Sequence, residues 1–167
     1  MCERTVFCHP YFYFTWGAAV SEALIDINTG ENRILRADII QDCGNSLNEN
    51  IDIGQIEGGF IQGLGWLTCE ELCFSQEGKL LTTGPSTYKL PGSRDVPPIF
   101  NVKLLENADN DEKTIFRSKA VGEPPLLLAI SHFLALKEAI KASLPSSKAE
   151  LLNSPATPSE ILKAIYA

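Results

Sequence analysis

The stretch RSKAVGEPPLLLAISHFLALKEAI, residues 117–140, decides how the C-terminal half of the chain folds. Its apolar run follows two prolines, and proline suits the first turn of a helix because no backbone N–H is needed there. From Leu126 to Ser143 the sequence is apolar almost all round, which is typical of a helix buried on every side. We therefore predict a fully buried helix over 126–143.

One acidic residue, Glu123, lies at the entrance to this helix, directly after Gly122. A residue before proline is biased away from helical backbone angles, so we expect Glu123 to be extended. The helix dipole favours an ionised carboxylate, whereas partial burial among apolar neighbours disfavours the charge. An acid under these opposed influences is suited to accept a proton near neutral pH. The structural alternative is an acidic cap that stabilises the helix by about 0.3–1 kcal/mol.

A second helix is indicated in ENIDIGQIEGGFIQGLGWLTCEEL by apolar residues at helical spacing, and we predict that it spans about 51–72. Each glycine inside it costs about 0.5–1 kcal/mol relative to alanine. The spacings of four, from Gly54 to Gly58 and from Gly59 to Gly63, remove side chains from a face of the helix. Either another backbone or a flat cofactor can then approach closely, and the pattern alone favours packing.

The whole pattern predicts an α+β fold: strand pairs in a mixed sheet, with the glycine-rich helix and the buried C-terminal helix packed on it. β-branched residues alternate around a turn in residues 17–42, which predicts two strands. We further expect a strand pair at 73–91, strands at 99–106 and 114–119, and a last helix at 158–166 capped by Thr157.

Charge and cysteine content narrow the function classes. The net charge of −7 disfavours nucleic acid and anionic membrane surfaces as partners, and no stretch is apolar enough to span a membrane. Five cysteines, an odd number without a CxxC pair, indicate reduced thiols in a cytoplasmic compartment. Cys69 and Cys73 lie far from both histidines, so we predict no metal ligands.

Three motifs closely resemble, in the same order, the C-terminal part of the molybdenum-binding subunit of bacterial-type xanthine dehydrogenases. Xanthine dehydrogenases belong to the molybdenum hydroxylase family, which also includes aldehyde oxidases. The motifs are SKAVGEPPLLLAISHFLALKEAI, NSLNENIDIGQIEGGFIQGLGWLTCEEL and TTGPSTYKLPGSRDVP. The resemblance covers residues 10–167, which it identifies as an incomplete molybdopterin-binding domain, and leaves 1–9 as an unmatched strand lead-in.

The resemblance implies roles for three residues. Glu123 would act as the general base that takes a proton from an oxygen activated by molybdenum, during oxidation of a purine such as xanthine or hypoxanthine. Gln55 would hydrogen-bond near the molybdopterin, and the backbone N–H of Gly122 would lie close to the metal ligands. FAD, iron–sulfur clusters and NAD would bind only to other modules of the enzyme.

The family's molybdenum subunit is several times longer, so the resemblance implies a fragment that is inactive alone. Its partners would be the remaining molybdenum-domain segments and the iron–sulfur and FAD modules. Two alternatives stay open: a non-catalytic remnant that self-associates into a homo-oligomer, and a small-molecule binder that uses the glycine-rich helix. The choice between xanthine, an aldehyde and another heterocycle as substrate rests on residues outside this sequence.

Overall fold

The computed structural model describes residues 11–167, so the proposed lead-in at 1–9 lies outside the described residues. These residues form a three-stranded mixed sheet with three α-helices and short 3-10 turns. The predicted α+β class is confirmed. None of the helices in this part of the chain has the length and apolar character needed to cross a bilayer.

The predicted strand pair in residues 17–42 is present as β1 (Gly17–Ile25) and β2 (Asn32–Gln41), which run antiparallel. The turn between them needs Gly30, whose φ of +74° favours glycine. The predicted strand after the long loop is β3 (Ile99–Leu104), and it pairs with β2 in parallel. The sheet order is therefore β1-β2-β3.

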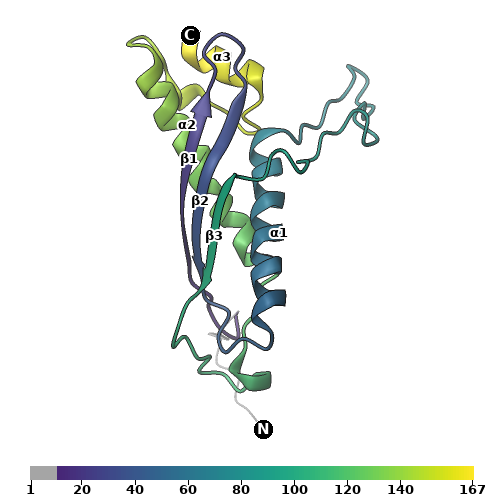
Figure 1. Ribbon diagram of the computed structural model, residues 1–167. Coiled ribbons are helices and arrows are strands. Elements are labelled where there is room, and N and C mark those ends of the chain that lie inside the picture. The colour runs from purple at the N-terminus through teal and green to yellow at the C-terminus, as the bar shows by residue number, and fades with distance from the viewer. Residues whose placement is uncertain (1–10) are drawn as a thin grey trace, which may run out of the picture.

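The glycine-rich helix is α1 (Glu49–Thr68), close to the predicted span, and it runs alongside the sheet (Figure 1). Asn48 caps it, because its side chain accepts a hydrogen bond of 3.3 Å from the backbone N–H of Ile51. Phe60 lies at the centre of the first core cluster, where its ring contacts Phe100 of β3 with centroids 5.5 Å apart.

The C-terminal apolar run is not one fully buried helix. It forms a 3-10 turn, η2 (Pro124–Ala129), and then α2 (Ile130–Ser143). Buried positions in α2 are limited to one stripe at i, i+4 spacing, made of His132, Leu136 and Ile140. Leu127 and Leu134 are 59% and 55% exposed, because nothing in residues 11–167 covers the outer side of this segment.

The second core cluster joins α2 to the end of the chain. Leu136 and Ile140 pack there with Ile161 and Ile165 of α3 (Pro158–Tyr166), and the 3-10 turn η3 (Ala149–Leu151) closes the connection. The last helix is confirmed. Thr157 occupies its N-cap position but its side chain makes no capping hydrogen bond.

Two predicted strand regions are wrong. Residues 73–91 contain only an isolated bridge between Phe74 and Leu80, within a long loop that extends away from the sheet (Figure 1). Residues 114–119 contain the 3-10 turn η1 (Ile115–Arg117). The positive φ values of Phe116 and Arg117, 52° and 58°, are incompatible with a strand.

Candidate functional site

Glu123 occupies the N-cap position of η2. Its φ of −96° and ψ of −37° lie in the helical region, so the prediction of an extended residue is wrong. The reason is the 3-10 turn itself, which closes when the N–H of Leu126 donates to the Glu123 carbonyl at 3.0 Å. The side chain is exposed, contrary to the expected partial burial, because residues 11–167 place nothing over it.

The carboxylate of Glu123 makes no capping hydrogen bond to η2. The interpretation as a structural cap therefore lacks the contact that defines such a cap. Among the described residues, none of the ion pairs involves this carboxylate either. It stands at the surface with its acceptor oxygens available for a partner outside this chain.

Gln55 and Gly122, distant in sequence, are brought together next to Glu123. The amide oxygen of Gln55 lies 3.4 Å from the position that a Cβ at Gly122 would occupy. Gln55 projects from an exposed position of α1, whereas Gly122 belongs to the segment that enters η2. The Gln55 amide therefore lies close to Gly122, at a distance that would be an ordinary van der Waals contact for an added Cβ.

A pair of buried glycines in α1 makes this meeting possible. A Cβ added at Gly59 would lie 3.0 Å from the carbonyl oxygen of Gly122 and 3.3 Å from Cβ of Pro125. At Gly63 an added Cβ would overlap the carbonyl oxygen of Leu126. We call Gly59 and Gly63 the packed row. Their missing side chains allow the backbone of η2 to lie directly against α1.

A buried ion pair anchors the segment that carries the site. The Lys119 ammonium lies 2.6 Å from the Asp42 carboxylate, and the two side chains are only 9% and 1% exposed. The Lys119 backbone N–H also donates to the carbonyl of Cys43 at 2.7 Å. Removing either charge would leave the other buried without a partner, which is strongly unfavourable. This pair therefore fixes residues 117–122 to the end of β2.

Sequence reasoning missed Asp42 and Lys119. An aspartate at the end of a strand is usually a turn residue, and a lysine near an apolar run is usually solvated. The signal that was available is the apolar sequence that follows Lys119, which suggests partial burial and hence a partner for its charge.

A second pair of glycines lies on a bare part of α1. Cβ atoms added at Gly54 and Gly58 would meet nothing within 4 Å, and both positions are exposed. We call Gly54 and Gly58 the open row. It flanks Gln55, so a neutral amide stands beside a strip of uncovered backbone. Such a strip, with amide donors and acceptors beside it, leaves room for a flat polar group to approach the helix backbone.

Within residues 11–167, no group of three or more His, Cys, Asp or Glu side chains is arranged to hold a metal ion. Burial raises the pKa of the Cys43 and Cys69 thiols, and nearby carboxylates raise it further. The environment of both thiols therefore favours the protonated form.

The sequence is similar to known molybdenum-cofactor proteins. Residues 1–97 match the family described as "Molybdopterin cofactor-binding domain". Among curated relatives, "Xanthine dehydrogenase/oxidase" of Felis catus is 52% identical over 162 residues, covering 93% of this chain and 12% of that protein. "Xanthine dehydrogenase" of Dictyostelium discoideum is 54% identical over 134 residues, covering 80% and 10%. The chain thus spans about 12% of the length of the curated relatives it matches.

Solved structures share the fold. Quinoline 2-oxidoreductase from Pseudomonas putida 86 superposes with a TM-score of 0.73 at 28% identity, covering 84% of this chain and 17% of that one. The Cu,Mo-CO dehydrogenase superposes with a TM-score of 0.77 over 92% of this chain and 19% of that one. At 19% identity the second likeness concerns the fold alone.

Proposed function

Because the chain belongs to the molybdopterin cofactor-binding domain family, we propose that it forms one wall of the cofactor pocket in a xanthine dehydrogenase-type enzyme. In this proposal Glu123 is the general base, and Gln55 and Gly122 contact the cofactor. The observation that supports this proposal is that the Gln55 amide lies close to Gly122, the residue before Glu123, and is flanked by the open row.

The bound cofactor would supply the oxidation chemistry, and the residues of this chain would position it and move one proton. Gly54 and Gly58 would let the cofactor approach the backbone of α1, where a side chain would keep it away. The Gln55 amide would both donate to and accept from a polar ring without adding charge. The Gly122 N–H would supply one further donor.

Glu123 would hold the proton that leaves the attacking oxygen. Its carboxylate is exposed and makes no cap contact, so its oxygens can reach a substrate without first breaking a bond within this chain. Once the rest of the enzyme covers the site, desolvation would make the carboxylate a better base. The Asp42–Lys119 pair would keep its backbone in place during this transfer.

The substrate would be a purine such as xanthine or hypoxanthine. The partners would be the remaining molybdenum-domain segments and the modules that carry iron–sulfur clusters, FAD and NAD, because curated relatives are much longer than this chain. A cytoplasmic location stays a prediction, which the free thiols of Cys43, Cys69 and Cys73 support.

The test is reconstitution with the missing segments, followed by a xanthine turnover assay. Glu123→Gln should lower kcat about 10²–10⁴-fold, because the amide is nearly isosteric but cannot accept the proton. Cofactor content, measured as bound molybdenum, should stay at the wild-type level. Equal turnover by wild type and Glu123→Gln would refute the assigned role.

A matched control is Glu138→Gln. Glu138 lies on α2, and its exposed carboxylate pairs with Lys141 at 2.5 Å, away from Gln55 and Gly122. Its substitution should leave turnover unchanged, since an exposed pair of this kind contributes about 0.2–1 kcal/mol to stability at most. A similar loss in both variants would indicate a general effect of removing acids.

Self-association without catalysis is the second candidate, and the exposed face of β1 favours it. Val20 and Leu24 are 71% and 54% exposed there, and Trp16 just before the strand is 67% exposed. These side chains lie on one face of the chain, with the exposed Glu22 between Val20 and Leu24. Size-exclusion chromatography of the chain alone should then give an oligomer. A monomer that stays soluble would contradict this candidate.

A further inference from the structure

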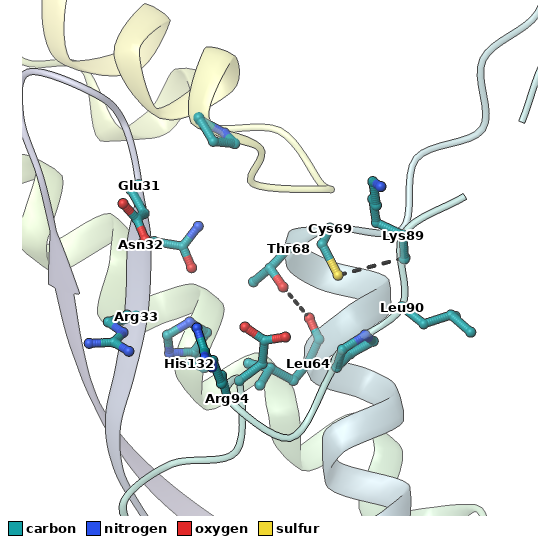
Figure 2. A pocket seen from close by; sticks show the side chains of 13 residues that line it. Glu31, Asn32, Arg33, Leu64, Thr68, Cys69, Lys89, Leu90, Arg94 and His132 are labelled. Carbon is teal, nitrogen blue, oxygen red and sulfur yellow. Dashed lines mark hydrogen bonds between the residues drawn. The ribbon is translucent and has the colours of Figure 1, made fainter. Parts of the chain in front are cut away.

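A pocket of about 350 Å³ lies at the opposite end of α1 from Gln55. Figure 2 shows it between β2 and the C-terminal part of α1. Its walls include Asn32 and Arg33 of β2, Thr68 at the end of α1, Arg94 of the long loop and His132 of α2. Segments that are distant in sequence therefore converge on one hollow.

His132 is the unusual member of this lining. The side chain is 1% exposed, and among the described residues neither ring nitrogen has a hydrogen-bond partner. A buried polar atom without a partner costs about 1–3 kcal/mol, so such atoms are rare unless a bound group satisfies them. Neighbouring positions of the buried stripe, Leu136 and Ile140, are aliphatic, and packing alone does not require an imidazole.

The charged groups around the pocket point to the kind of group that fits. Three cations line it, Arg33, Lys89 and Arg94, together with two anions, Glu31 and Asp95. The Asp95 carboxylate already accepts a hydrogen bond of 2.7 Å from the Gly92 N–H.

In the part of the chain that the structure describes, neither Arg33 nor Arg94 takes part in an ion pair. The Arg33 side chain extends from the other side of β2, on the face of its exposed partner Leu24 (Figure 2). The Arg94 guanidinium, a planar fork of N–H donors, is thus the arginine available beside the imidazole. Guanidinium forks match the oxygen geometry of carboxylate and phosphate groups.

We propose that this pocket binds a small oxyanion, a carboxylate or phosphate group, held by His132 and Arg94. The imidazole would contribute a buried donor, and Arg94 would neutralise the charge at the mouth of the pocket. The proposal does not depend on the role of Glu123, because the pocket and Glu123 share no residue.

The test follows the ring resonances of histidine in the full 167-residue chain while inorganic phosphate, and separately acetate, is added. Sodium chloride at matched ionic strength removes general screening effects. The His132 resonance should shift saturably with at least one anion and should not shift with chloride. The resonance of His9, the other histidine of the chain, is followed in the same spectra.

Arg94→Ala should weaken the binding about tenfold, as expected for the loss of one charge-assisted hydrogen bond. Arg94 is exposed on a loop, so the fold should survive this change. Arg33→Ala and Arg36→Ala are the matched controls: the Arg33 side chain lies on the other face of β2, and Arg36 lies outside the pocket and pairs with Asp38. The proposal is overturned if neither anion shifts His132, or if Arg94→Ala binds like these two controls.

Discussion

The packed row and the open row of α1 contain the same residue at the same spacing of four, yet they do different things. Gly59 and Gly63 are buried against the backbone of η2, where an added Cβ would collide. Gly54 and Gly58 are exposed, and an added Cβ would touch nothing within 4 Å. The first pair is explained by packing within this chain. The second pair destabilises the helix, and no packing contact among the described residues offsets this cost.

The difference teaches that a glycine pattern has to be interpreted residue by residue. Glycine in a helix interior costs about 0.5–1 kcal/mol relative to alanine. The packed row offsets that cost by letting η2 approach, and the adjoining Gly122 lies close to the Gln55 amide. The open row has no such contact among the described residues, and the proposed function assigns it to the approach of the cofactor. Three predictions test this contrast.

The largest effect is expected from His132, which is buried on α2. Burial lowers the pKa of His132 to about 4 from 6.5. Well above pH 6.5 the imidazole is neutral in both the folded and the unfolded chain, so its protonation does not change the free energy of unfolding. As the pH falls from 6.5 toward 4, the unfolded chain takes up the proton first, so the free energy of unfolding should drop by about 3 kcal/mol.

Urea unfolding at several pH values measures this drop, and His132→Leu is the control. The variant lacks the titrating group, so the difference between the two proteins isolates the contribution of His132 from that of the carboxylates. Parallel stability curves for both proteins between pH 6.5 and 4 would show that the imidazole is not buried in solution.

A smaller effect is expected from Gly63→Ala. The added Cβ would overlap the Leu126 carbonyl oxygen and lie 2.9 Å from Cβ of Ala129, so η2 has to move away from α1. Overpacking of this kind should lower the free energy of unfolding by about 1–3 kcal/mol, measured by urea unfolding at neutral pH. Wild-type stability in this variant would mean that η2 and α1 are not in close contact.

The smallest effect is expected from Gly58→Ala, and it has the opposite sign. Nothing obstructs the added Cβ, so the chain alone should gain about 0.5–1 kcal/mol of stability from the higher helix propensity of alanine. In the reconstituted enzyme the same variant should bind less molybdenum cofactor, because the methyl group would occupy the strip where the cofactor approaches. Unchanged cofactor content would remove the open row from the proposed pocket.

Local patterns were sufficient for much of the fold. Alternation around the Gly30 turn predicted β1 and β2, and helical spacing predicted α1 and α3. The strand predictions were wrong for residues 73–91 and 114–119, because β-branched and aromatic residues raise strand propensity whether or not a partner strand is present. The backbone of Phe116, at a φ of 52°, is set by the tertiary position of η1 and by no local preference.

The sequence by itself determined the fold class and the glycine-rich and last helices, because these depend on the periodicity of contiguous residues. Through its motifs it also suggested Glu123, Gln55 and Gly122, whose roles stay predictions. Only the tertiary structure decided which glycines are packed, where the Asp42–Lys119 pair lies and how exposed Glu123 is. Burial and charge pairing depend on residues that are distant along the chain, and a single segment carries no information about what will cover it.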